Sequence, residues 1–376
     1  MKDVVNNFQS DSSPAPGFPP KLAAGVLPLT LLALVCLGCG GCRPSAPDGR
    51  PIRLRLAHVY EVRSPTHAHG TAHLPDRIAS ADVGLQLTVY PAAQLGSEEE
   101  LLEQLVAGEL ELAIAGPSFL AMWYPELGAF DAAYAFRDLD HMLEVAHGPL
   151  IQPLWDELLH RYGVRVLDTW VYGARHITSN RPIRHPDDLR GFRLRLPAAR
   201  VWQASGEALG ASPMPVAFAE VYMALQQGLA DGQENPIPTI QAMGFHEVQS
   251  HLNLTGHIQS SIQILVNERV WQRLTVDQQV ALKQAIRGLG DQVYQGTVLD
   301  EQQILERWRD QRVLEVVEDV DRDAFRSRAR QYFATGFPFS SLYQTISDWD
   351  WDPLLTTPVS GDDINGPESR TGAEEP

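Results

Sequence analysis

The chain has 376 residues, of which 44% are hydrophobic and 20% charged, as expected for one large two-lobed domain or two domains with a buried core. Lys and Arg number 30 against 47 Asp and Glu, so the formal net charge is −17. This acidic balance argues against a nucleic-acid-binding protein, because phosphate contacts need a basic face.

The N-terminal region predicts an exported protein. Residues 22–38 carry no charge and follow Lys21, as in the apolar core of a secretory signal. These seventeen residues are short for a membrane-spanning helix, which needs about 20. We therefore expect the protein to work outside the cytoplasm.

All three cysteines lie within the end of this apolar stretch or just after it, at positions 36, 39 and 42, so the rest of the chain has no thiol for catalysis, zinc binding or disulfides. Leu37-Gly38-Cys39 resembles the lipobox of bacterial lipoproteins. We expect residues 1–39 to be a lipoprotein signal with an N-terminal extension, Cys39 to be lipidated with Cys42 as second candidate, and residues 40–51 to form a tether. A plain cleaved signal and an uncleaved anchor are the alternatives.

The first half of the chain alternates strand and helix patterns. Period-2 alternation predicts strands over residues 52–57, 85–89 and 110–114. A capping box at Ser97–Glu100 predicts a helix that ends near Gly108. Residues 66–81 should form another helix, broken or restarted at Pro75. This order predicts a parallel sheet with right-handed crossovers.

The second half continues in the same way. Strands are expected at 164–172 and 192–196, and apolar residues at helical spacing predict a helix over 218–229. A long helix should begin at Thr275, whose hydroxyl can cap it, and run towards Arg312, bracing two lobes. Residues 353–376 are polar and rich in Pro, Gly and acid, which predicts a disordered tail.

Two polar segments are candidates for ligand binding. On the strand 192–196, Arg193 and Arg195 alternate with apolar residues, and Arg195 lies at the carboxyl end, where its guanidinium could hold a carboxylate. The alternative is a solvated strand face. The segment 231–236, DGQENP, is dense in amides and acids, although Asp-Gly and Asn-Pro also favour a simple polar turn.

Other motifs predict no catalysis and no cofactor. His67, His69 and His73 could suggest a metal site, but a solvated helix start explains them better and no metal is expected. The chain has no dinucleotide-binding or phosphate-binding glycine motif, no HExxH and no GxSxG. Aromatic residues such as Phe218 and Tyr222 could stack on a ligand, although such residues more often belong to the core.

Several of these segments, in this order and spacing, resemble the solute-binding proteins of TRAP transporters, the DctP-like family. The matching segments are QLG at 94–96, RHITSN at 175–180, DLRGFRLRLP at 188–197, GASPMP at 210–215, FAEVY at 218–222 and DGQENP at 231–236. The resemblance covers about residues 52–335. It implies an α/β, two-lobed periplasmic-binding-protein-like fold, with a ligand cleft between the lobes and a long bracing helix.

The resemblance also implies lobe boundaries and site residues. Lobe 1 would hold residues 52–172 plus about 261–300, and lobe 2 residues 173–260 plus about 301–340. In the family the arginine at the place of Arg195 pairs with the ligand carboxylate. The remaining expected contacts are Arg175, Asn235 and Phe218, followed by Tyr60, Gln94, Ser118 and Tyr222.

The implied function is capture of a small organic acid and its delivery to an ion-coupled TRAP permease, without catalysis. C4-dicarboxylates, keto acids, sugar acids and aromatic acids all fit one arginine and a mixed pocket. Val59 and Gly116 fall where some acid-sugar binders of the family place polar or acidic side chains, which argues against an acid sugar of that kind. A ligand-binding module for a signalling partner is the alternative, and an extracytoplasmic hydrolase is a third, weaker one.

Overall fold

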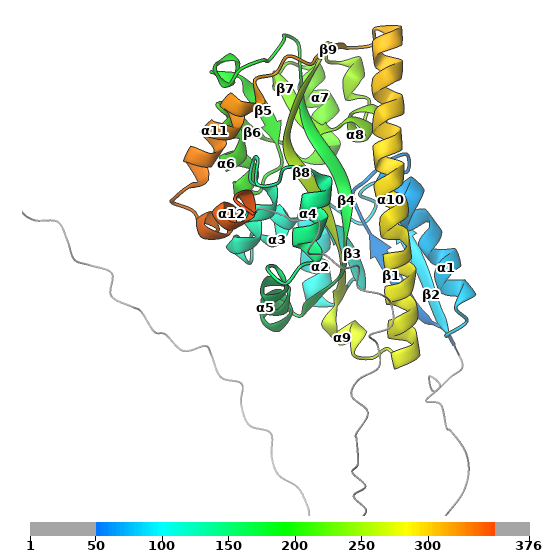
Figure 1. Cartoon of the computed structure of the whole chain (residues 1–376). Coiled ribbons are helices and arrows are strands. Elements are labelled where there is room, and N and C mark those ends of the chain that lie inside the picture. The colour runs from blue at the N-terminus through cyan, green and yellow to red at the C-terminus, as the bar shows by residue number, and fades with distance from the viewer. Residues whose placement is uncertain (1–49, 350–376) are drawn as a thin grey trace, which may run out of the picture. The chain divides into compact units, whose positions relative to one another are not determined.

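The computed structural model describes residues 50–349 (Figure 1). The predicted signal segment, the lipidation site at Cys39, nearly all of the tether and the predicted tail at 353–376 lie outside the described residues. No helix within 50–349 is long and apolar enough to cross a membrane.

One mixed sheet runs through the described part of the chain (Figure 1). Its strands are β1 (Ile52–Ala57), β2 (Leu85–Tyr90), β3 (Leu112–Ala115), β4 (Val164–Ser179), β5 (Arg193–Leu196), β6 (Ser212–Pro215), β7 (Gly232–Pro236), β8 (His251–Asn267) and β9 (Glu315–Val317). The order is β2-β1-β3-β8-β4-β7-β5-β6, and β9 pairs with β8. The sheet therefore has a first half-sheet (β1, β2, β3) and a second half-sheet (β5, β6, β7), joined by β4 and β8.

The pairing directions confirm the predicted parallel arrangement inside each half-sheet. β1 is parallel to β2 and β3, and β5 is parallel to β6 and β7. The sheet as a whole is not parallel, because β8 runs antiparallel to β3 and β4, and β4 runs antiparallel to β7. The long strands β4 and β8 run through both half-sheets. Because β3 with β8, β8 with β4 and β4 with β7 all pair antiparallel, the strands of the second half-sheet run opposite to those of the first.

Twelve α-helices of residues 50–349 cover the sheet. They are α1 (Leu74–Ser80), α2 (Glu98–Ala107), α3 (Pro117–Leu120), α4 (Leu139–His147), α5 (Gln152–Tyr162), α6 (Arg200–Leu209), α7 (Val221–Gln226), α8 (Ile237–Ala242), α9 (Glu268–Trp271), α10 (Val276–Gln311), α11 (Arg322–Phe333) and α12 (Ser340–Ser347). The helix expected at 66–81 is interrupted as predicted: a π-helical turn and a 3-10 turn precede α1, and Pro75 lies in the first turn of α1, where no amide hydrogen bond is lost.

The bracing helix is α10, and its predicted bounds are right. The Thr275 side chain caps it by accepting a hydrogen bond from the Gln278 amide, and Arg312 ends it in the left-handed conformation. α10 packs on β4, and it contacts α1 beside the first half-sheet and α8 beside the second (Figure 1). One rigid helix thus spans both half-sheets.

Two boundaries differ from the sequence prediction. β4 continues to Ser179, well beyond residue 172, so one strand crosses from one half of the sheet to the other. The helix expected to reach Leu229 ends at Gln226, and Leu229 is exposed. The chain turns there to enter β7, so Leu229 has no core to pack against.

β4 bends where it passes β7. Its register against β8 shifts between Val171 and Gly173 and again between Arg175 and Ile177. Gly173 has φ +129°, and a Cβ there would lie 2.9 Å from Cβ of Pro236. Glycine therefore allows the close approach of β4 to β7 that sets the position of Arg175.

Candidate functional site

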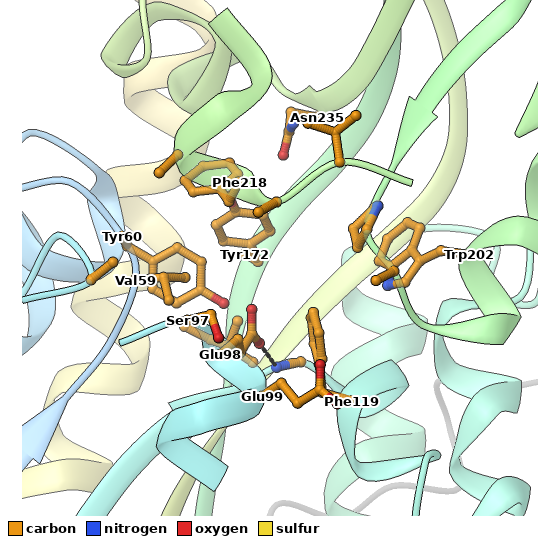
Figure 2. A pocket seen from close by; sticks show the side chains of 18 of the residues that line it. Val59, Tyr60, Ser97, Glu98, Glu99, Phe119, Tyr172, Trp202, Phe218 and Asn235 are labelled. Atoms are coloured by element: carbon orange, nitrogen blue, oxygen red, sulfur yellow. Dashed lines mark hydrogen bonds between the residues drawn. The ribbon is translucent and has the colours of Figure 1, made fainter. Parts of the chain in front are cut away.

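A cavity of about 420 Å³ lies where strands of both half-sheets end (Figure 2). The first half-sheet contributes residues that follow β1, β2 and β3, including Tyr60, Glu98 and Gly116. The second contributes residues at or after the ends of β5, β6 and β7, including Arg195 and Asn235. The carboxyl ends of parallel strands are the usual place for a ligand in an α/β fold, so this cavity is the candidate site.

Arg195 is buried at the end of β5. The side chain of Arg193, on the same strand face, is exposed and pairs with Asp231, but Arg195 is only 1% exposed, so a solvated strand face is wrong for Arg195. Its Nε and Nη2 donate to the Val216 carbonyl at 3.0 and 2.6 Å, while the buried Nη1 has no hydrogen-bond partner among residues 50–349. Burial lowers the pKa of Arg195 to about 10. No carboxylate among residues 50–349 forms an ion pair with Arg195.

Arg175 is also buried, but the protein itself neutralises its charge. From β4, its Nη2 donates to Oε1 of Glu234 at 2.8 Å and to Oδ1 of Asn235 at 3.0 Å, and its Nε donates to Oε2 of Glu234. Glu234 is fully buried on β7, next to Nε2 of His257 at 3.3 Å. Burial alone would raise the pKa of Glu234, but Arg175 and His257 outweigh it and hold that pKa below its usual range.

The segment 231–236 is not a polar turn. Residues 232–236 form β7, all five of them buried, with β4 on one side and β5 on the other. Asn235 lines the cavity, and its Nδ2 donates to Oε1 of Gln233 at 2.6 Å. With Arg175 on its Oδ1, the Asn235 amide is held in one orientation from both ends.

Four carboxylate residues line the cavity on the side of the first half-sheet, Glu61, Glu98, Glu99 and Asp131, and sequence reasoning missed all of them as site residues. Two of them, Glu98 and Asp131, accept hydrogen bonds from backbone amides. Oε1 of Glu98, in the first turn of α2, accepts a hydrogen bond from the Gly116 amide at 2.6 Å (Figure 2). Asp131, 1% exposed, accepts one from the Ser118 amide at 2.9 Å and another from the Ser118 hydroxyl. Burial raises the pKa of Glu98 to about 7 and that of Asp131 to about 6.

The signals for these two acids were weak. Glu98 belongs to the acidic run Glu98–Glu100, which a helix dipole explains without any ligand. Asp131 lies in no motif and reaches the cavity through a 3-10 segment, Pro125–Asp131, whose path only packing decides.

Aromatic side chains form much of the remaining wall. The rings that line the cavity belong to Tyr60, Phe119, Tyr172, Trp202 and Phe218 (Figure 2). The rings of Tyr60 and Tyr172 lie 5.0 Å apart between their centroids. The Trp202 ring packs on the Arg175 guanidinium at 4.4 Å, and that of Phe218 lies 6.0 Å from Arg195 Cζ. The cavity can therefore hold an apolar carbon chain between polar ends.

The structure brings five of the eight predicted contact residues to the cavity. They are Tyr60, Arg175, Arg195, Phe218 and Asn235. The other three lie outside its lining: Gln94 is exposed in a loop, Ser118 is buried against Asp131, and the Tyr222 hydroxyl donates to Glu247 at 3.2 Å.

The three histidines near residue 70 do not converge. His67 contacts Thr71 and His58, His69 pairs with Asp300 at 2.8 Å, and His73 contacts the Ala68 carbonyl. Within the described range no group of His, Cys, Asp and Glu side chains is arranged to hold a metal ion.

Comparison with known proteins places these features in a family. A sequence profile of the DctP family, described as bacterial extracellular solute-binding protein, family 7, matches residues 56–337. The sialic acid-binding periplasmic protein SiaP of Vibrio cholerae is 38% identical over 207 residues, 55% of this chain and 64% of that protein. A solute-binding protein of Roseobacter denitrificans is 33% identical over 255 residues, 68% of this chain and 78% of the relative.

Solved structures agree. A TRAP periplasmic solute-binding protein of Roseobacter denitrificans with bound 3-deoxy-D-manno-oct-2-ulosonic acid has a TM-score of 0.74 at 28% identity, over 79% of this chain and 99% of that one. Another from the same organism, with bound L-galactonate, has a TM-score of 0.73 at 30% identity, over 79% and 99%. One from Sulfurospirillum deleyianum with bound succinate has a TM-score of 0.71 at 27% identity, over 79% and 98%.

Proposed function

This chain belongs to the DctP family of bacterial extracellular solute-binding proteins, and from that premise we propose that its cavity captures a small organic acid through Arg195. One observation carries the assignment: Arg195 is a buried cation that lines the cavity, has a free Nη1 and pairs with no carboxylate among residues 50–349. A buried charge without a partner is costly, so an anionic ligand is the natural complement. Similar proteins hold carboxylates, among them L-galactonate and succinate.

The neighbouring groups support this role for Arg195. The Val216 carbonyl holds Nε and Nη2, which orients the guanidinium before the ligand arrives. Asn235 and Arg175 line the same cavity, and the Nη1 of Arg175 takes part in none of the hydrogen bonds that Arg175 forms within the described chain. Arg175 and Asn235 would therefore supply second polar contacts, while Phe218 and Tyr60 would cover the carbon chain.

Delivery to the membrane is the second part of the proposal. The ligand would close the two predicted lobes, residues 52–172 plus about 261–300 and 173–260 plus about 301–340, by bending β4 and β8, and a TRAP permease would recognise the closed form. Export with a lipid anchor at Cys39 would keep the protein at the membrane surface. Ligand uptake by membrane vesicles that contain the permease should then require added binding protein.

Thermal unfolding against a panel of organic acids tests the binding function. An acid at 100 times its dissociation constant should stabilise the protein by about 2.7 kcal/mol. Arg195→Met should lose this shift, whereas the matched control Arg193→Met, which changes an exposed arginine on the same strand, should keep it. No shift with any acid, or equal shifts in both variants, would contradict the proposal.

A further inference from the structure

A second cavity, of about 620 Å³, lies where α11 and α12 meet the chain segment 134–137. The two helices pack on each other at one side of the second half-sheet (Figure 1). This cavity shares no lining residue with the ligand cavity, so it is a separate site. We call it the arginine pocket, and its lining includes Tyr134, Arg137, Arg326, Arg330, Asp348 and Trp349.

The arginine pocket is basic, although the whole chain carries a formal net charge of −17. Its lining holds three arginines and a single carboxylate, Asp348. Within residues 50–349, Arg137 forms no ion pair, and Arg326 and Arg330 pair only with Asp323 and Asp348, whose side chains are 87% and 70% exposed. Exposed ion pairs of this kind contribute little to stability, so the pocket is suited to a further anionic group.

The chain runs along this pocket as it leaves α12. Nη2 of Arg330, on α11, donates to the Ser347 carbonyl at 2.7 Å and lies 3.3 Å from Oδ1 of Asp348. Nη1 of Arg137 donates to the Trp349 carbonyl. Two arginines from distant parts of the chain thus hold three successive residues, 347–349, at the wall of the pocket.

The next three residues of the sequence have the chemistry that such a pocket accepts. They are Asp350, Trp351 and Asp352, two carboxylates on either side of an indole. Carboxylates form charge-assisted hydrogen bonds with guanidinium groups, and an indole ring packs on their planar faces. Because a residue spans at most about 3.6 Å, the Cα atoms of these three can lie no farther than about 11 Å from that of Trp349. The covalent chain therefore keeps them within reach of the pocket.

The segment 134–137 connects the arginine pocket to the ligand cavity. It begins three residues after Asp131, which lines the ligand cavity. The Tyr343 hydroxyl, on α12, donates to the carbonyl of Ala133 in the same stretch at 2.9 Å. A chain segment that fills the pocket would therefore strengthen the attachment of α12 to the wall that carries Asp131.

We propose that the arginine pocket is the docking site of the chain's own segment 350–352, Asp-Trp-Asp. Its two carboxylates pair with Arg137 and Arg326, and its indole packs on the guanidinium groups. The docked segment stabilises the packing of α11 and α12 on the rest of the domain. The direct covalent link to Trp349 gives this segment a high effective concentration at the pocket, which favours it over the same segment of a second copy. The inference goes beyond the proposed function and does not depend on it.

Urea denaturation of the full chain without ligand tests this inference. The triple variant Asp350→Asn/Trp351→Ala/Asp352→Asn removes the charges and the ring of the docking segment. It should raise the equilibrium constant of unfolding by about fivefold or more. The matched control, Asp362→Asn/Asp363→Asn/Ile364→Ala, removes the same charge farther along the chain and should leave that constant unchanged.

A double-mutant cycle shows whether the segment acts through the pocket. Arg137 and Arg326 are both exposed, so Arg137→Gln/Arg326→Gln should fold. In this background the triple variant should change the equilibrium constant of unfolding by less than about twofold, because the partners of the segment are already gone.

Other occupants of the pocket give other results, and each would overturn the inference. A triple variant as stable as the control shows that the segment does not dock, and an equal loss of stability with and without the two arginines places the segment elsewhere. Stability of the native protein that rises with protein concentration, but not in the triple variant, places the segment on a second copy. Inorganic phosphate that stabilises both proteins equally through Arg137 and Arg326 assigns the pocket to a free anion. None of these results bears on Arg195, so the proposed function stands or falls separately.

Discussion

The two walls of the cavity are built in different ways. The wall of the second half-sheet carries its polar groups on strands: Arg175 on β4, Arg195 on β5 and Asn235 on β7. The wall of the first half-sheet carries Glu98 and Asp131 on a helix start and a 3-10 segment that follow the strands. One wall is thus cationic and built into the sheet, and the other is acidic and built on connecting segments.

This difference suggests a division of roles. β5 and β7 each pair with strands on both sides, so the positions of their side chains are fixed by backbone hydrogen bonds that any ligand would leave unchanged. Connecting segments can vary in sequence and path without disturbing a sheet. The strand wall therefore suits the part of the ligand common to all organic acids, and the connecting wall suits the part that distinguishes them.

The largest expected effect concerns Arg175 within the strand wall. Arg175→Met leaves the carboxylate of Glu234 buried without its guanidinium, which should lower the free energy of unfolding by about 3–5 kcal/mol. Urea denaturation of the ligand-free protein measures it. Adding Glu234→Gln in the Arg175→Met background should recover part of the lost stability. An Arg175→Met protein as stable as the native one would show that the Arg175–Glu234 ion pair does not stabilise the fold.

Arg195 should respond in the opposite way. Arg195→Met removes a buried charge that has no counter-ion, so the free energy of unfolding of the ligand-free protein should stay the same or rise. Affinity for the organic acid should fall by about 100-fold or more, because a carboxylate would then be buried unpaired. Calorimetric titration and urea denaturation of the same sample separate the two quantities. A large loss of stability in Arg195→Met would contradict the expectation that Arg175 stabilises the fold whereas Arg195 serves ligand binding.

A glycine in each wall compares how tightly the walls are packed. A Cβ at Gly232 would lie 2.2 Å from the Thr178 carbonyl oxygen, so Gly232→Ala should lower the free energy of unfolding by about 1–3 kcal/mol or more. At Gly116, φ is −74° and the nearest atoms are at ordinary distance, so Gly116→Ala should cost less than about 1 kcal/mol. Equal losses of stability in the two variants would contradict the expectation that the wall of the second half-sheet is packed more tightly than the wall of the first.

Another expected effect is on the pH dependence of stability. Folding raises the pKa of Glu98 from 4.5 to about 7, so between these values the folded state binds more protons than the unfolded state. Its contribution to stability therefore falls as pH rises through this range. Glu98→Gln removes the contribution, so the variant should gain stability relative to the native protein between about pH 5 and about pH 8. Parallel pH profiles, measured by urea denaturation without ligand, would show that Glu98 ionises as an ordinary surface glutamate.

Local patterns predicted much of the fold. The alternation at 52–57 and 85–89 and the cap at Thr275 specify β1, β2 and α10, because each depends on residues close in the chain. The alternation at 192–196 also placed Arg195 at a strand end. What these patterns could not distinguish was a buried arginine from a solvated one, since that depends on the strands that flank β5.

The sequence by itself determined elements such as β1, β2 and α10, the resemblance to the family and the arginine at the carboxyl end of β5. Only the tertiary structure decided which arginine remains available. Glu234 meets Arg175 because β4 and β7 pair antiparallel in a register that joins residues 59 positions apart, and no local period encodes that register. Glu98 and Asp131 likewise meet at Gly116 through folding of distant segments. Burial and pairing of charges depend on contacts across the sheet, whereas periodicity reports only the residues within one element.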